Sequence, residues 1–186
     1  MNILIIYGSL NEKSLNGALA HAMLAQKPDD VTLEIVRVPE FSLYSMEREV
    51  VFPADVAAFK QKIADADGVV IVTPEYNRGM PGSLKNFIDW TSRPFGQHPW
   101  GGKPVGVMGA SNGPRGTIVA QYDLKRIMTY FGAQVMGQPE LYLDNSDKKI
   151  EDGVLKDEKT KEYLQKYLAA FKSHIESFEK NTQTVR

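Results

Sequence analysis

Three short runs of apolar residues constrain the fold of this chain more than any other feature of its sequence. They occupy residues 3–7, 69–72 and 105–108, and each is followed at once by glycine, serine, threonine or proline. An apolar run without polar alternation suits a strand that is buried on both faces, as in the parallel sheets of α/β proteins. The three runs therefore predict the central strands of a parallel sheet.

Further strands and helices are expected around these three. Residues 31–38 mix apolar and polar side chains, as an edge strand does, and a fifth strand is expected near 134–143. Apolar residues three and four positions apart predict helices near 15–23, 56–66, 84–91, 118–131 and 164–178. With right-handed crossovers, this alternating order predicts an α/β three-layer sandwich. Its five-stranded parallel sheet has the order 2-1-3-4-5 and helices on both faces.

Length and composition limit the kinds of function. The 186 residues fit one domain, expected over residues 1–178, with a polar, disordered tail at 179–186. The net charge is -1, with 22 basic and 23 acidic residues, which argues against nucleic acid as a partner. The absence of cysteine excludes disulfides and thiol nucleophiles. Without a signal-peptide pattern or a long apolar run, we expect a cytoplasmic protein with no membrane partner.

The candidate site lies in the loops that follow strands 1, 3 and 4, because ligands of open α/β sheets bind where the strand order reverses. The first loop, "GSLNEKSLN" (8–16), matches neither G-x-x-x-x-G-K-[ST] nor G-x-G-x-x-G. It supplies the polar side chains of Ser9, Asn11, Ser14 and Asn16. Ser14 stands where a helix begins, so it either caps the helix or helps the helix N-terminus to bind a phosphate.

The second loop is the most distinctive stretch. "PEYNRGMPG" (74–82) has nine residues, whereas a connection in an α/β unit commonly needs about 2–6. Gly79 and Gly82 permit close backbone approach, and Tyr76 and Asn77 can pack against a flat heterocycle. The alternative is an elaborate turn with Tyr76 on the surface.

The third loop, "GASNGPRGT" (109–117), contains three glycines. They indicate close approach of a ligand or a subunit, or a plain turn.

Outside these loops, the chemistry-bearing residues do not form a site. His21, His98 and His174 are far apart, so no metal site is expected. Asp65 and Asp67 suit a solvated turn, and the two tryptophans, Trp90 and Trp100, suit a core or an interface.

The three loops, together with "DGVVIVTPEYNRGMPGSLKNFIDWTSRP", resemble the NADPH-dependent FMN reductase family over about residues 3–175. That flavodoxin-like family includes quinone, azo-dye and chromate reductases. The resemblance implies that the first loop holds the FMN phosphate, that residues 74–77 line the isoalloxazine, and that the third loop borders its other side. The implied cofactor-binding residues are Ser9, Asn11, Ser14, Leu15, Asn16, Pro74, Glu75, Tyr76, Asn77, Arg78, Ser111, Gly113 and Gly116.

The resemblance also implies the reaction and the assembly. Flavin N5 accepts hydride from NADPH or NADH, and a flavin, quinone, azo compound or similar small molecule is then reduced by two electrons in a ping-pong cycle. No catalytic side chain is needed. The family's members are usually dimers or tetramers, and we expect a contact near residues 93–100. The alternative is a flavodoxin-type electron carrier or an FMN-binding regulatory module, although the charge of -1 is unlike strongly acidic carriers.

Three details refine the cofactor and substrate expectations. FMN is expected rather than FAD, because no fingerprint for an AMP half is present. Asn11 stands where the family commonly has an arginine, and Lys13 is the substitute cation. Arg78 stands where many relatives have an aromatic or small residue. Its guanidinium either reaches the pocket mouth, near NADPH or an anionic acceptor, or forms a surface ion pair across a subunit boundary.

Overall fold

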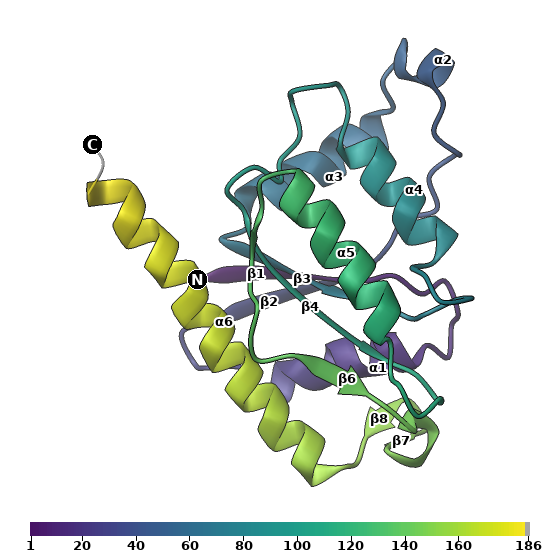
Figure 1. The fold of residues 1–186 in the computed structure, drawn as a ribbon, viewed down its shortest axis with the longest axis vertical. Helices are drawn as coiled ribbons and strands as arrows, with labels where there is room; N and C mark the ends of the chain where they lie inside the picture. Colours follow the sequence, from purple (N-terminus) through teal and green to yellow (C-terminus); the bar gives the residue numbers. More distant parts are fainter. Residues whose placement is uncertain (185–186) are drawn as a thin grey trace.

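The computed structural model describes the backbone of residues 1–184 and the side chains of residues 1–178. Its parallel sheet has the strand order β2-β1-β3-β4-β5, with β6 also paired to β4, and helices cover both faces (Figure 1). The strands are β1 (Asn2–Tyr7), β2 (Thr32–Arg37), β3 (Gly68–Val72), β4 (Pro104–Ala110), β5 (Gln134–Val135) and β6 (Leu141–Leu143). The predicted fold and strand order are confirmed.

The fifth position of the sheet is divided between two short strands. Gln134 and Val135 pair with the start of β4, whereas Leu141–Leu143 pair with its end. Between them the chain leaves the sheet at Gln138 and Pro139. Because proline has no N–H to donate to a strand ladder, it interrupts the strand expected near 134–143.

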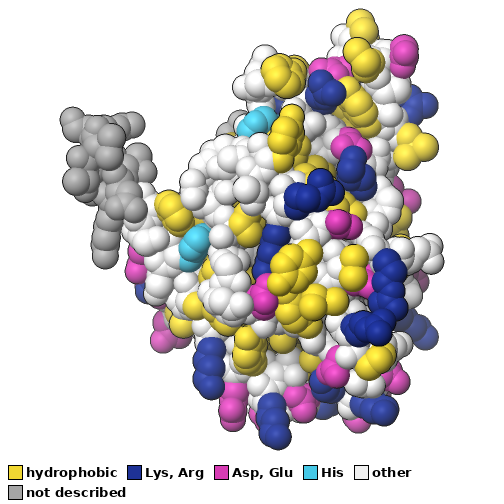
Figure 2. Space-filling model, in the orientation of Figure 1, with side chains coloured by type: hydrophobic (Ala, Val, Ile, Leu, Met, Phe, Trp, Pro, Cys, Tyr) yellow, Lys and Arg dark blue, Asp and Glu magenta, His cyan; other side chains and the backbone are white. Residues whose placement is uncertain are grey.

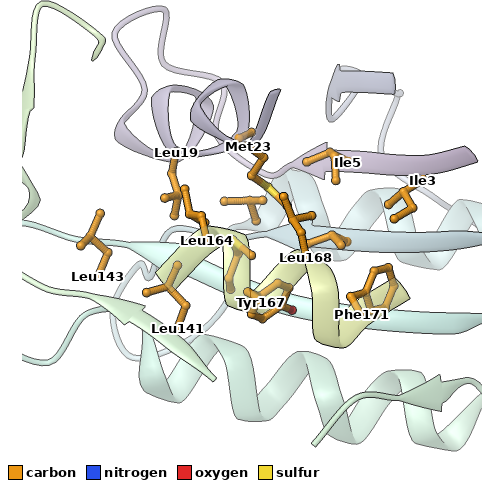
Figure 3. Packing of buried hydrophobic residues seen from close by; sticks show 14 of the residues in the cluster. Ile3, Ile5, Leu19, Met23, Leu141, Leu143, Leu164, Tyr167, Leu168 and Phe171 are labelled. Atoms are coloured by element: carbon orange, nitrogen blue, oxygen red, sulfur yellow. The ribbon is translucent and has the colours of Figure 1, made fainter. Parts of the chain in front are cut away.

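The helices form two layers. They are α1 (Leu15–Ala22), α2 (Met46–Glu49), α3 (Ala54–Asp65), α4 (Gly82–Thr91), α5 (Ile118–Tyr130) and α6 (Glu158–Thr184), with 3-10 turns η1 (Met23–Ala25) and η2 (Ser146–Lys148). One apolar cluster joins α1 and α6 to the sheet through Ile3 and Ile5 (Figure 3). The other joins α3, α4 and α5 to it through Leu4 and Ile6. The side chains of successive β1 residues thus pack on opposite faces of the sheet.

Some elements differ from the sequence-based expectation. The four-residue helix α2, the turn η2 and a small hairpin of β7 (Ile150–Glu151) and β8 (Val154–Leu155) were not expected. Helix α6 is assigned through Thr184, and residues 185–186 lie outside the described residues. The division into a domain at 1–178 and a disordered tail at 179–186 stays a prediction.

Trp90 and Trp100 lie in the core, one of the two places expected for them, and other aromatic residues lie at the surface. Trp90 and Trp100 are both fully buried, and the Trp100 indole donates a hydrogen bond to Thr91 Oγ1 at 3.2 Å. Trp100 is therefore a core residue, and in the segment 93–100 Phe95, which is 84% exposed, is the large apolar side chain at the surface. Tyr122, on the helix expected near residues 118–131, is 56% exposed.

Within the described part of the chain, no helix is long and apolar enough to cross a membrane. The same residues contain no group of three or more histidine or acidic side chains placed to hold a metal ion.

Gly106 in the middle of β4 is required by packing. A Cβ there would lie 2.5 Å from the hydroxyl of Tyr167, which is fully buried and donates to Val107 O at 3.3 Å. Helix α6 can therefore lie close to β4 only because position 106 carries no side chain.

We predict that Gly106→Ala lowers the free energy of unfolding by about 1–3 kcal/mol, the usual cost of overpacking a core. The double variant Gly106→Ala/Tyr167→Phe should lose less than the sum of the two single variants, because removing the hydroxyl relieves the collision. Urea denaturation of the four proteins measures the coupling. Strict additivity would show that the collision does not limit the packing.

Candidate functional site

The loops after β1, β3 and β4 meet at one end of the sheet and enclose a cavity of about 470 Å³. This is within the usual size range of small-molecule sites. Its lining residues are Ser9, Asn11, Lys13, Ser14, Leu15, Asn16, Pro74, Glu75, Tyr76, Ala110, Ser111 and Asn112. The structure therefore brings together most of the predicted site residues. Asn77, Arg78, Gly113 and Gly116 are not in the lining.

The first loop is held by hydrogen bonds from its own backbone to its polar side chains. Ser9 Oγ accepts from Asn11 N at 3.3 Å, and Asn11 Oδ1 accepts from Lys13 N at 2.9 Å. Ser14 Oγ accepts from Gly17 N at 3.0 Å, so Ser14 is the N-cap of α1. A hydroxyl that accepts still has its own proton to donate. Capping and ligand binding are therefore compatible for Ser9 and Ser14.

These donors gather at the start of α1. The first N–H groups of a helix have no acceptor within the helix, and the helix dipole favours an anion beside them. The backbone N–H groups of Leu15 and Asn16 have no acceptor among the described residues. The ammonium of Lys13 has no ion-pair partner among them either. Two hydroxyls, two amides and a cation make a donor set that suits a phosphate.

The side chain of Asn16 joins the start of α1 to the end of β4. Its Nδ2 donates to Ala110 O at 3.0 Å, and its Oδ1 accepts from Ala110 N at 2.9 Å. The residue is 3% exposed, and both ends of its side-chain amide are bonded to the end of β4. The Asn16 side chain thus positions α1, its backbone N–H is available to an anion, and its contact with a phosphate stays a prediction.

The second loop contains a tight hairpin. Tyr76 N donates to Gly79 O at 2.9 Å, and Gly79 N donates to Tyr76 O at 3.0 Å. Asn77 and Arg78 between them have φ values of 51° and 65°. Positive φ at both central residues is the type I′ hairpin turn. Pro74, Glu75 and Tyr76 line the cavity, whereas Asn77 and Arg78 at the centre of the turn are not among its lining residues.

Glu75 connects the second loop to the start of α5. Its Oε2 accepts from Val119 N at 3.0 Å and from Ala120 N at 3.3 Å. These are the N–H groups that an N-cap side chain normally satisfies. The N-cap residue Thr117 makes no such bond, because its Oγ1 accepts from Gln121 Nε2 at 2.9 Å. Sequence reasoning missed this role, since the acceptor lies 44 residues before Val119.

Arg78 pairs with a carboxylate of its own loop. Its Nη1 lies 3.3 Å from Glu75 Oε1, and its side chain is 61% exposed. The structure thus supplies a partner within the chain, whereas the sequence left open a carboxylate across a subunit boundary.

Two of the three glycines of the third loop, Gly109 and Gly116, are explained by contacts within the chain. A Cβ on Gly109 would collide with Thr73 O and Thr117 Oγ1. Gly116 has a φ of 57°, and a Cβ there would lie 2.8 Å from the carbonyl carbon of Tyr142. Gly113 donates its N–H to Ser111 Oγ at 3.1 Å. Gly113 and Gly116 are not among the lining residues, and their cofactor contacts stay predictions, whereas Ser111 lines the cavity.

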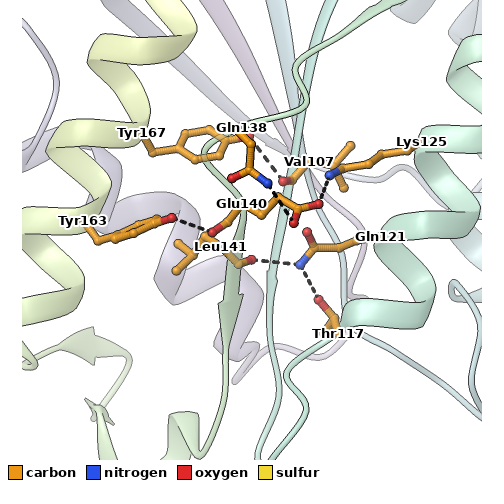
Figure 4. A network of polar contacts seen from close by, with 9 residues as sticks. All are labelled: Val107, Thr117, Gln121, Lys125, Gln138, Glu140, Leu141, Tyr163 and Tyr167. Atoms are coloured by element: carbon orange, nitrogen blue, oxygen red, sulfur yellow. Dashed lines mark hydrogen bonds and ion pairs between the residues drawn. The ribbon is translucent and has the colours of Figure 1, made fainter.

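A polar network behind the third loop fixes α5 against β6 (Figure 4). Gln121 Nε2 donates to Leu141 O at 2.9 Å, and Lys125 forms an ion pair with Glu140. Burial raises the pKa of Glu140, but Lys125 and the other polar neighbours of the carboxylate together outweigh it and hold that pKa below its usual range. The network therefore anchors the helix whose N-terminus Glu75 caps.

Lys13, Ala110 and Asn112 complete the lining. Ala110 and Asn112 were missed, although both adjoin Ser111 in the third loop. Asn112 Oδ1 accepts from Asp147 N at 3.1 Å, which attaches the loop to η2. That turn could not be read from the sequence pattern.

Known proteins resemble this chain along nearly its whole length. A sequence profile of the NADPH-dependent FMN reductase family matches residues 1–148. The 2-hydroxy-1,4-benzoquinone reductase of a Burkholderia species is 43% identical over 176 residues, covering 94% of this chain and 96% of that protein. The quinone reductase of Escherichia coli K12 is 37% identical over 183 residues, covering 95% and 96%.

A solved structure also resembles this chain in fold. The flavoenzyme NAD(P)H:(acceptor) oxidoreductase FerB from Paracoccus denitrificans superposes with a TM-score of 0.87 at 34% identity, covering 95% of this chain and 98% of that one.

We predict that Glu75→Ala lowers the free energy of unfolding by about 1–2 kcal/mol, because two N-terminal N–H groups of α5 lose their acceptor. Arg78→Ala is the matched control, since it removes only an exposed partner of the same carboxylate and should cost about 0–1 kcal/mol. Urea denaturation compares the two variants. Equal losses would contradict a capping role for Glu75.

Proposed function

The chain belongs to the NADPH-dependent FMN reductase family, and we propose that it holds FMN in the cavity formed by the loops after β1, β3 and β4. It is an NAD(P)H-dependent FMN and quinone reductase. The observation that carries the proposed cofactor site is the set of unpaired donors at the start of α1, which opens into a cavity of about 470 Å³. A phosphate satisfies those donors, and a flat ring fits between the other two loops.

The phosphate end is assigned to the first loop. Ser9 and Ser14 donate their hydroxyl protons, and Leu15 and Asn16 donate their backbone N–H groups. Lys13 supplies the positive charge that Asn11 does not, so Asn11 acts through its bond to Lys13 N, which shapes the loop. Charge-assisted hydrogen bonds of this kind are the stronger ones in proteins.

The ring end is assigned to the second and third loops. Pro74, Glu75 and Tyr76 form one wall of the cavity, and Ala110, Ser111 and Asn112 form another. Ser111 Oγ accepts from Gly113 N and keeps a proton for a ring heteroatom. The Glu75 carboxylate is occupied by α5, so this residue contributes the position of the loop.

Bound FMN would supply the hydride chemistry, first accepting hydride from NAD(P)H and then reducing a quinone. The chain itself has to bind and orient the reactants. The titratable side chains in the lining are Lys13, Glu75 and Tyr76. Of these, Glu75 is engaged by α5, Lys13 belongs to the first loop, and Tyr76 belongs to the second. The lining therefore suits a ping-pong exchange without a protein acid or base.

We propose that two copies associate through the segment 93–100. Its exposed Phe95 supports this, together with Tyr130, which is 79% exposed at the end of α5. Figure 2 shows hydrophobic side chains gathered over the face that α5 crosses in Figure 1. A dimer, or a tetramer built from it, would cover these aromatics.

The function is tested by purifying the protein and recording its visible spectrum before and after adding NADPH or NADH. FMN released on denaturation, bleaching by the nucleotide and steady oxidation with a benzoquinone support a reductase. Bound flavin without turnover would instead indicate an electron carrier or a regulatory module. Light scattering of the same sample at micromolar concentration tests the assembly, and a monomer would refute it.

We predict that Lys13→Ala weakens FMN binding about tenfold, because a hydrogen bond to a charged group is lost. The loss should shrink at high salt, which already screens the exposed ammonium. Lys166→Ala, an exposed lysine of α6, is the control and should bind FMN as the wild type does. Isothermal titration of the apoproteins measures both. An unchanged affinity in Lys13→Ala would remove Lys13 from the site.

We predict that Arg78→Ala changes the KM for NADPH and for NADH less than twofold, because this arginine forms an exposed ion pair. Steady-state kinetics at two salt concentrations test this. A tenfold rise for NADPH alone would place the guanidinium on the phosphate of that nucleotide and return Arg78 to the pocket.

A further inference from the structure

A second cavity adjoins the phosphate end of the proposed FMN site. It has a volume of about 470 Å³ and shares Asn11, Lys13 and Ser14 with the first cavity. Its other lining residues are Tyr7, Glu12, Gly17, Ala18, His21, Arg37 and Gly153. The two cavities thus lie on either side of the same loop, and Lys13 borders both.

This second cavity continues along α1. A third cavity of about 380 Å³ shares Ala18, His21 and Gly153 with it. The remaining lining of the third cavity is largely apolar, from Ala22, Ala25, Val154 and Leu155, with Gln26 and Lys161 also present. The second and third cavities together form a groove between α1 and the β7–β8 hairpin, which we call the α1 groove.

The part of the α1 groove nearest the FMN site carries unused donors. Arg37 contacts Leu10 O at 3.4 Å and Glu40 at 3.6 Å, which leaves most of its five N–H donors available. His21 Nδ1 lies 2.8 Å from Gly17 O, so Nδ1 donates there, and Nε2 is an acceptor in the neutral ring and a donor only in the protonated ring. Glu12 opposes an anion here, but two cations, Lys13 and Arg37, outweigh one carboxylate.

Gly17 of α1 lets the ring of Tyr7 pack closely at the side of the groove. A Cβ on Gly17 would lie 3.3 Å from the Tyr7 ring, so glycine allows that ring to rest against α1. The hydroxyl of Tyr7 has no hydrogen-bond partner among the described residues. Further along, the alanines of α1 present a flat apolar surface. The α1 groove is therefore cationic at the end near the proposed FMN site and largely apolar at the other end.

We propose that the α1 groove receives the AMP half of FAD, so that the chain binds FAD as well as FMN. The inference rests on the proposed function, which places the flavin phosphate at the start of α1. From there, a second phosphate lies between Lys13 and Arg37, and the adenine lies on Ala18, Ala22 and Ala25 under Val154. The lack of a G-x-G-x-x-G fingerprint led us to expect FMN alone, but this groove provides the room without that motif.

The test compares the affinities of the apoprotein for FMN and FAD by isothermal titration. We expect FAD to bind within about tenfold of FMN. Arg37→Ala should weaken FAD about tenfold and FMN less than twofold, because only FAD reaches the α1 groove. Ala25→Tyr should narrow the apolar end of the α1 groove and weaken the binding of FAD alone. Position 25 is exposed and therefore tolerates the larger side chain.

Arg126→Ala is the matched control. Arg126, like Arg37, forms an exposed ion pair with a residue three positions away, here Asp123 at 3.9 Å, but it lies on α5. It should change neither affinity. FAD binding that is a hundredfold weaker than FMN binding, or equal effects of Arg37→Ala on both flavins, would overturn the inference and leave the proposed function intact. Failure of the wild type to bind FMN would refute both.

Discussion

The site depends on the pair of hydrogen bonds between the Asn16 side chain and the backbone of Ala110. These residues are 94 positions apart, and their two bonds hold the first turn of α1 at the end of β4. Because the pair is buried, leaving either group without a partner would be costly. The donors at the start of α1 are thereby held at a constant distance from the third loop, which a rigid cofactor spanning both loops requires.

Glu75 performs the corresponding task between the second loop and α5. Its carboxylate replaces a local N-cap, so the loop that lines the cavity moves only with the helix. Behind that helix, Gln121 and the Lys125–Glu140 pair attach α5 to β6. Polar contacts thus join the first loop to the end of β4, the second loop to α5, and α5 to β6.

In the first and third loops, the same side chains serve structure and binding at different atoms. The oxygens of Ser9, Ser14 and Ser111 accept from the backbone, which shapes each loop. Their hydroxyl protons then remain for a ligand, as does the backbone N–H of Asn16. A loop preorganised in this way loses little conformational entropy when it binds, which is the physical advantage of serine at these positions.

The sequence by itself determined the sheet, its order and the location of the site. Apolar runs without alternation can be buried only in central parallel strands, and the carboxyl ends of such strands must meet at one edge. The roles of individual residues were decided by tertiary structure. Nothing near Glu75 or Asn16 in the chain indicates their partners, because those partners arrive from 44 and 94 residues away. Gly109 and Gly116 look in sequence like ligand-binding glycines, but neighbouring segments of the chain occupy the space that their side chains would need. The α1 groove likewise exists only because α1 packs beside the β7–β8 hairpin, a contact that no local pattern of residues encodes.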